Sequence, residues 1–236
     1  MFSIKVGGIQ KSSLIDYPEK ISAIIFTQGC NFRCPYCHNP ELITGNREQG
    51  TVDGKLSTDS VLEFLKNRIG KLDGVVITGG EPTLQKGLKE FIEEIKGLGF
   101  LVKLDTNGTN PEILRELQDK RLIDYVAMDI KAPIEKYGEV VDARVNTRNI
   151  LKSIELVKNS GIDYEFRTTV LKSQLCIDDF EKIGKMIKGA NKYYLQKFVP
   201  TKTLNESFMT QATYSDEEFA EIIEGLNKYV RDVFVR

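Results

Sequence analysis

The stretch ISAIIFTQGCNFRCPYC, residues 21–37, joins a β-branched run to three cysteines spaced C-x3-C-x2-C. The run Ile21–Thr27 is typical of a buried strand, and the cysteines follow in the loop after it. Three thiolates can hold three irons of a cubane cluster and leave the fourth iron open to another ligand. Cys30, Cys34 and Cys37 therefore predict one 4Fe–4S cluster, with these three residues as its metal ligands and as the catalytic set.

The same cysteines allow three other interpretations. A thiol–disulfide motif at Cys34 would need a long helix after it, but Asn39-Pro40 and Gly45-Asn46 break the chain there. Covalent haem attachment needs an export signal, and we expect none, because Met1–Gly8 has no apolar segment of signal-peptide length. A zinc site that includes His38 stays open, although the usual second pair of ligands is missing.

Composition indicates one domain. The chain has 236 residues, 41% of them hydrophobic, and a net charge of -1, with Lys and Glu scattered rather than gathered into a basic stripe. We therefore predict a single domain over 1–236, with a core of about 20–200 and a C-terminal loop and helix over 201–236. We expect no duplex nucleic acid partner and no membrane association. Because the cysteine motif works only when reduced, we expect a cytoplasmic location.

Short β-branched runs alternate with amphipathic ones along the chain, which is typical of parallel βα units. The predicted strands are residues 21–27, 74–78, 101–105, 125–129, 164–170 and 192–198. The predicted helices are residues 56–69, 84–96, 111–118, 147–159, 177–187 and 215–230. Since a closed eight-unit barrel takes ~250 residues, the pattern favours an α/β fold with parallel strands, an open partial (β/α)6 barrel.

Polar and charged residues follow the ends of these strands, where parallel barrels place their active sites. Beside the cysteine loop, this set comprises Gly79, Gly80, Glu81, Asp105, Asp129, Lys131, Arg167 and Gln196. We expect these residues to meet at one mouth of the barrel.

Together with Gly79-Gly80-Glu81-Pro82, the cysteine motif resembles the radical S-adenosylmethionine (SAM) superfamily. More narrowly, the chain looks like the activating enzymes of glycyl-radical proteins, in particular the anaerobic ribonucleotide reductase activating group, from about Gly8 to Pro200. The runs that carry this likeness are Ser12–Pro18, Phe26–Cys30, Cys37–Leu42, Asp105–Gly108 and Met128–Lys131.

The resemblance implies that SAM chelates the open iron and is cleaved to methionine and a 5′-deoxyadenosyl radical, which abstracts hydrogen from a substrate. Gly79 and Gly80 let the backbone approach the amino group of SAM. Lys131 and Arg167 suit its carboxylate, and Asp105 and Asp129 suit its ammonium group and ribose hydroxyls. The full set of candidate cofactor-binding residues is Tyr36, His38, Gly79, Gly80, Glu81, Asp105, Asn107, Asp129, Lys131, Arg167 and Gln196.

Two further expectations concern ions and thiols. In the resembled activases, the positions of Asp105, Thr106, Met128 and Asp129 surround a monovalent cation, which makes such an ion a candidate here. Cys176 is the one cysteine outside the motif, so a second cluster is not expected. We expect Cys176 to be a buried thiol without a catalytic role.

The resemblance implies an electron donor such as flavodoxin or ferredoxin and a glycyl-radical protein as the hydrogen donor. The alternative is a lyase or rearranging enzyme for a small molecule, such as a 7-deazapurine or another nucleobase-like metabolite. Aromatics over Tyr193–Phe198 and Phe208 could stack on such a ring, although alternating aromatics on a strand usually belong to the core. A non-catalytic cluster carrier is the third hypothesis. Closure of the mouth by Ser3–Asp16, Gly45–Gly54 and Thr201–Thr213 would favour a small substrate.

Overall fold

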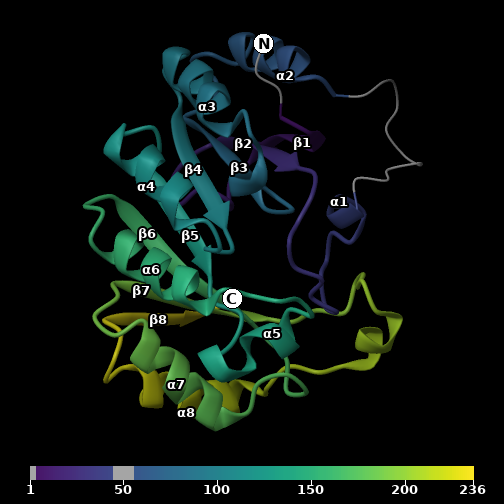
Figure 1. Ribbon diagram of the computed structural model, residues 1–236, viewed down its shortest axis with the longest axis vertical. Coiled ribbons are helices and arrows are strands. Elements are labelled where there is room, and N and C mark those ends of the chain that lie inside the picture. Colours follow the sequence, from purple (N-terminus) through teal and green to yellow (C-terminus); the bar gives the residue numbers. More distant parts are fainter. Residues whose placement is uncertain (1–3, 45–55) are drawn as a thin grey trace. The chain divides into compact units, whose positions relative to one another are not determined.

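The computed structural model describes residues 4–44 and 56–236, so the Gly45–Gly54 segment lies outside the described residues (Figure 1). The chain forms two compact units. Unit 1 contains Met1–Asn31, Glu41–Thr106 and Glu112–Val126, and unit 2 contains Phe32–Pro40, Asn107–Pro111 and Ala127–Arg236. That the whole chain is one domain stays a prediction.

The sheet of unit 1 is parallel except at its N-terminal strand. Its strands are β1 (Val6–Ser13), β2 (Ser22–Thr27), β3 (Gly74–Gly79) and β4 (Leu101–Thr106). β2, β3 and β4 pair in parallel, whereas β1 pairs antiparallel to β2. The β-branched runs fill the core, since Ile25, Val75 and Ile77 are fully buried. The parallel pairing confirms the predicted class.

Helices connect these strands, as the sequence predicts. They are α1 (Glu41–Thr44), α2 (Thr58–Lys66), the short 3-10 helix η1 (Pro82–Leu84), α3 (Leu88–Gly97) and α4 (Pro111–Asp119). The Ser57 hydroxyl caps α2 by accepting a hydrogen bond from the Ser60 amide at 3.0 Å. The predicted helix start at Leu84 is wrong, because Gln85 has extended backbone (φ -77°, ψ 118°) and interrupts the helical path before α3.

Unit 2 continues the βα alternation. β5 (Tyr125–Asp129) ends in it, followed by η2 (Ile134–Lys136), α5 (Tyr137–Val140), α6 (Thr147–Lys158), β6 (Asp163–Val170), α7 (Ile177–Met186), β7 (Lys192–Lys197), η3 (Glu206–Thr210), α8 (Asp216–Leu226) and β8 (Asp232–Val235). β6, β7 and β8 pair in parallel. Helices α7 and α8 lie side by side (Figure 1), and the Tyr214 ring packs edge-on against Phe180 and Phe219.

Two strands were not predicted from the sequence. β1 carries Gly7-Gly8 and polar residues, and its register with β2 shifts twice, so it shows no regular alternation of apolar residues. β8 has only four residues, too few for a periodic signal.

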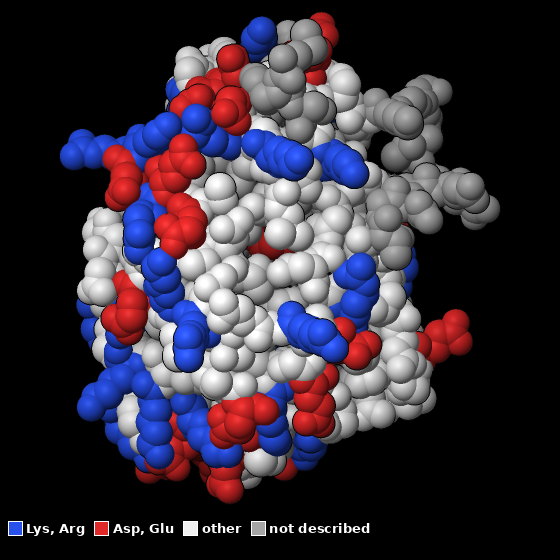
Figure 2. All heavy atoms as spheres, in the orientation of Figure 1, with Lys and Arg blue, Asp and Glu red and all other residues white. Residues whose placement is uncertain are grey.

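The surface agrees with the charge pattern of the sequence. On the face in Figure 2, acidic and basic side chains are interspersed, without a stripe of one sign. Over residues 4–44 and 56–236, every helix is too short or too polar to cross a bilayer.

Candidate functional site

The second and third cysteines of the motif lie in one tight turn of unit 2. The Cys37 amide donates to the Cys34 carbonyl oxygen at 3.0 Å, which places the two thiols on the same turn. The turn is anchored to α5, because the Arg33 amide donates to Val141 O at 2.9 Å and the buried Phe32 ring meets Tyr137 edge-on. These local bonds hold Cys34 and Cys37 in place without a ligand.

Burial and charge act in opposite directions on the Cys34 thiol. The residue is 8% exposed, and burial raises the pKa of its thiol to about 11, against the lowering influence of Lys131. A cation beside a buried thiol is suited to a ligand that binds metal as the thiolate.

Tyr36, between the two cysteines, is buried and lies 6.5 Å from the Phe208 ring of η3. Its hydroxyl has no well-formed hydrogen bond among the described residues. It nevertheless lies close enough to the Cys34 thiol to lower the pKa of that thiol and so to oppose part of the effect of burial. A buried hydroxyl without a well-formed hydrogen bond is costly, so this atom is suited to a bound group that accepts a hydrogen bond from it.

His38 fastens the end of the cysteine loop to the segment after β7. Its ring stacks on Phe198 at 5.4 Å, and Nε2 lies 3.1 Å from the Val199 carbonyl oxygen, to which a protonated Nε2 donates. A contact between His38 and the cofactor stays a prediction. The structure shows that His38 also anchors the cysteine loop to Phe198 and Val199, which the sequence did not indicate.

Three predicted residues meet in an ion cluster between the end of β5 and the second half of β6. Arg167 Nε donates to Asp129 Oδ1 at 2.8 Å, and Lys131 Nζ donates to Asp129 Oδ2 at 3.0 Å. Burial disfavours each charge, but the two cations hold the pKa of Asp129 well below its usual range, and Asp129 holds the pKa of Lys131 above its own. The cluster stays ionised at neutral pH, with two cationic side chains on one carboxylate.

Asp129→Asn should lower the free energy of unfolding by about 3 kcal/mol, because two largely buried cations would lose their carboxylate while the 23% exposure of Asp129 leaves some solvent screening. Chemical denaturation at pH 7 measures the loss. The depressed pKa of Asp129 stabilises the fold above the unfolded pKa, and this contribution disappears as pH falls through the folded pKa. The gap between variant and wild type should therefore shrink in strong acid.

Asp119→Asn is the matched control, since Asp119 is exposed at the end of α4. It should change the unfolding free energy by less than ~0.5 kcal/mol. An Asp129→Asn variant as stable as this control would contradict the importance of the ion cluster.

In unit 1, Cys30 and the predicted glycines are joined through the backbone. The Glu81 amide donates to Gly29 O at 2.8 Å, directly before Cys30. A Cβ atom on Gly80 would lie 2.1 Å from the same oxygen. Gly79 has φ +115°, and a Cβ atom added to it would lie 2.4 Å from the Thr27 backbone nitrogen. Only glycine fits at both positions.

Glu81 is buried, and its carboxylate organises the loop after β3. Oε1 accepts hydrogen bonds from the Thr83 amide at 3.1 Å, the Thr83 hydroxyl at 2.6 Å and the Thr106 hydroxyl at 2.8 Å. The Thr106 partner ties the ends of β3 and β4 together, a contact that spacing in the sequence did not reveal.

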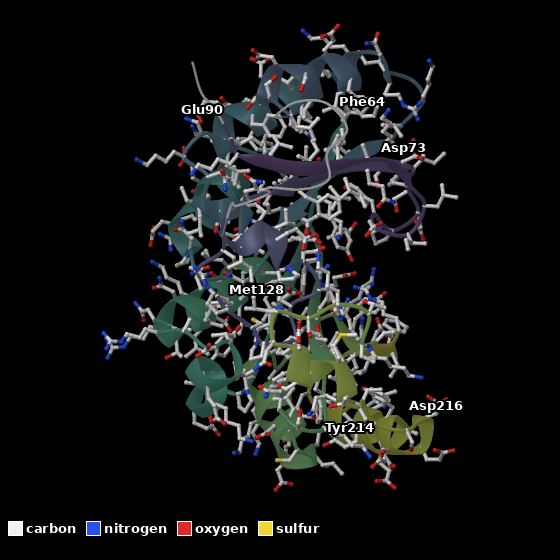
Figure 3. All side chains as sticks on the ribbon, turned by 90° about the vertical axis from the view of Figure 1, so that its right-hand side faces the viewer. Phe64, Asp73, Glu90, Met128, Tyr214 and Asp216 are labelled. Atoms are coloured by element: carbon white, nitrogen blue, oxygen red, sulfur yellow. The ribbon has the colours of Figure 1, made fainter. Side chains whose placement is uncertain are left out.

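Asn107 shapes the loop after β4. Its Oδ1 accepts from the Thr109 amide at 3.0 Å and hydroxyl at 2.7 Å, which is an Asx turn. The next residue, Gly108, has φ +75° and lies against Met128, which is labelled in Figure 3. The Met128 methyl carbon would be 2.1 Å from a Cβ atom added to Gly108. Asn107 is therefore a loop-forming residue as well as a candidate ligand.

Gln196 lies on β7 opposite Thr169 of β6, two positions after the Arg167–Tyr194 pair. Paired residues on neighbouring strands share a face, so Gln196, Tyr194 and Arg167 project from the same side of the sheet. Tyr193 projects from the other side and is fully buried, with its hydroxyl donating to Thr168.

The structure corrects one expectation and adds one residue. Cys176 is exposed rather than buried, because it is the N-cap of α7, with its amide bonded to Asp179 Oδ2 at 2.9 Å. Lys103, which sequence analysis did not select, lies 2.6 Å from Asp105 Oδ1. Because Lys103 is two residues before Asp105 on β4, the sequence could have indicated that the two side chains share one face of the strand.

The parallel strands, the Cys34–Cys37 turn and the ionised cluster are features suited to an enzyme that holds a metal group on cysteines beside a charged ligand. Residues 24–187 match the radical SAM superfamily, and the chain belongs to it. Membership implies a 4Fe–4S cluster and SAM.

The relatives include enzymes of more than one kind. A Methanocaldococcus jannaschii protein provisionally named a glycyl-radical enzyme activating enzyme is 39% identical, over 98% of this chain and 95% of its own length. The 7-carboxy-7-deazaguanine synthase of Thermococcus kodakarensis is 28% identical, over 77% of this chain and 76% of its own. The structure of QueE from Escherichia coli superposes with a TM-score of 0.53 at 15% identity, covering 99% of this chain and 92% of that one, and shows the predicted open, partial-barrel fold.

Proposed function

We propose that this chain is an activating enzyme that cleaves SAM reductively and uses the 5′-deoxyadenosyl radical to abstract a hydrogen atom from a glycine of a partner protein. The observation that carries the proposal is the Asp129–Lys131–Arg167 cluster, whose Lys131 also acts on the Cys34 thiol. Its two cationic side chains suit the carboxylate of an amino-acid ligand held beside the cysteines. The 39% identical relative supports the activase assignment.

The residues present fit the implied groups. The thiols of Cys30, Cys34 and Cys37 are not in disulfide bonds and would hold three irons, and the buried Tyr36 hydroxyl would donate a hydrogen bond to a bound group. When bound, the cluster would supply the electron that breaks one carbon–sulfur bond of SAM, leaving methionine and the radical. A flavodoxin or ferredoxin is the proposed source of that electron.

The chain's own residues bind and orient SAM in this proposal. Lys131 and Arg167 hold the methionine carboxylate, while Asp129 keeps both cations in position. Gly79 and Gly80 expose backbone to the amino group, and Tyr36 contacts the adenosine part. The remaining proposed contacts are His38, Glu81, Asp105, Asn107 and Gln196.

The test is anaerobic. After reconstitution with iron and sulfide, we expect the protein to form 5′-deoxyadenosine from SAM when dithionite is added. A glycyl-radical protein added as the substrate should accelerate that reaction and acquire an electron paramagnetic resonance doublet, split by the one remaining α-hydrogen. SAM cleavage that this partner neither accelerates nor couples to a radical would contradict the activase assignment.

The second candidate is a small-molecule lyase. Tyr194 shares the sheet face of Arg167 and Gln196, and its ring stacks on Phe234 at 5.0 Å beneath the Arg236 guanidinium. This aromatic surface, and the likeness to a deazaguanine synthase, favour a planar heterocycle. If such a compound accelerates 5′-deoxyadenosine formation and the partner protein does not, the lyase is the correct function.

A further inference from the structure

Lys103 and Asp105 form a buried ion pair in unit 1. Both side chains project from the same face of β4, because they are two residues apart on one strand. The Nζ atom donates to Asp105 Oδ1 at 2.6 Å, and the two side chains are 3% and 14% exposed.

Apolar side chains and an aromatic ring also surround the Lys103 side chain. Val76 of β3 is aligned with Lys103, and Ile24 of β2 is aligned with Val76. The Tyr125 ring centre lies 5.9 Å from Nζ, and Tyr125 packs with Ile24 and Val76 in one hydrophobic cluster. A cation in such a position needs a charged partner, which fixes the ammonium group against Asp105.

This pair bears on the monovalent cation that the resembled activases hold at the positions of Asp105, Thr106, Met128 and Asp129. Here Asp105 already binds an ammonium group, and the Thr106 hydroxyl donates to Glu81. In unit 2, both oxygens of Asp129 accept hydrogen bonds from cationic side chains. These residues therefore do not fit a free cation, since each carboxylate has a positive charge supplied by its own unit.

We propose that the Lys103 ammonium group takes the place of a monovalent cation at Asp105, so that the enzyme binds SAM without K⁺ or Na⁺. The expected effect on SAM binding rests on the proposed function, whereas the ion pair between Lys103 and Asp105 does not depend on it. Lys103 acts as a positioning residue, because it fixes the orientation of the Asp105 carboxylate and neutralises it.

Lys103→Met tests the proposal, since methionine keeps most of the side-chain volume and removes the charge. Two readouts are compared at constant ionic strength, in K⁺, in NH₄⁺ and in the bulky tetramethylammonium ion. One is the thermal midpoint of the full chain without cluster or SAM, and the other is the Kd of SAM for the reconstituted protein. The wild type should give the same midpoint and Kd in all three salts.

The variant should depend on the cation. In tetramethylammonium, its midpoint should fall and its SAM Kd should rise about tenfold, whereas K⁺ or NH₄⁺ should restore the Kd to within about twofold by binding at Asp105. A merely structural role of Lys103 would leave the variant equally impaired in every salt, and that result would overturn the proposal.

Two controls keep the test specific. Lys96→Met removes the cation of the Lys96–Asp124 pair, at 2.7 Å in the same unit, and should show no preference among the three salts. Lys103→Met combined with Asp105→Asn removes the anion as well, so its midpoint should no longer depend on K⁺.

If Lys103→Met does not fold, the thermal midpoint of the wild type in the different salts tests the proposal instead. A wild-type midpoint that rises with K⁺ at constant ionic strength would overturn the proposal, and a flat response would support it. Because this readout needs no SAM, a failure of the proposed function would appear separately, as absence of SAM binding in the reconstituted wild type.

Discussion

Cys34→Ala should abolish 5′-deoxyadenosine formation and reduce the iron bound after reconstitution to well below that of the wild type. Only two thiolates of the motif would remain, too few to hold three irons of a cubane cluster. The fold should survive, because the substitution removes one sulfur atom from a turn that is held by the Cys37 amide and by the Arg33–Val141 bond. Iron analysis, the anaerobic SAM assay and a thermal midpoint on the same sample separate loss of the cluster from loss of the fold.

Cys176→Ala is the matched control for this experiment. Cys176 is exposed, and its backbone amide keeps the bond to Asp179 when the sulfur is removed. Iron content and SAM cleavage should equal those of the wild type. If Cys34→Ala retained cleavage, or if Cys176→Ala lost it, the assignment of the cluster to the three-cysteine motif would be wrong.

Gly80→Ala should have the next largest effect. The added Cβ would lie 2.1 Å from the Gly29 carbonyl oxygen and 2.7 Å from its carbon, and both are backbone atoms that cannot rotate away. The chain must separate at this point, which displaces the Cys30 end of the loop and weakens the Glu81–Gly29 bond. We expect SAM cleavage to fall by about 100-fold, as misplacement by ~1 Å can do, and the unfolding free energy to fall by about 1–3 kcal/mol.

Gly97→Ala provides the control for adding a methyl group. Gly97 ends α3, and a Cβ there meets nothing within 4 Å. Alanine favours a helix over glycine, so this variant should be more stable by about 0.5–1 kcal/mol, with unchanged SAM cleavage. If Gly80→Ala behaved like Gly97→Ala in SAM cleavage and in the free energy of unfolding, the close approach of Gly80 to Gly29 would not be needed for activity or stability.

The sequence predicted the parts of the fold that depend on local pattern. The strands around Ile24, Val76 and Val126 are uninterrupted apolar runs, and their limits agree with the structure to within one or two residues. The grouping of Asp129, Lys131 and Arg167 was also predictable, because neighbouring parallel strands end at the same edge of a sheet.

Other features depend on contacts between residues that are distant in sequence. The stacking of His38 on Phe198 joins residues 160 positions apart, and nothing local at either residue indicates it. The exposure of Cys176 follows from its place at the start of α7, which periodicity locates only to within a few residues. Lys103 was missed because a lysine inside an apolar strand looks like a solvated charge until its buried partner is known.

The irregular pairing of β1 has a consequence for self-association. β1 pairs with β2 along one side, and among the strands of residues 4–44 and 56–236 it is the first in the order of its sheet. Its register shifts between Val6 and Gly8 and again between Gln10 and Ser13, and the exposed Lys11 lies within the second shift. Bulges and an edge lysine make a strand a poor template for another chain. Concentrated preparations of this protein should therefore resist aggregation by strand addition at β1.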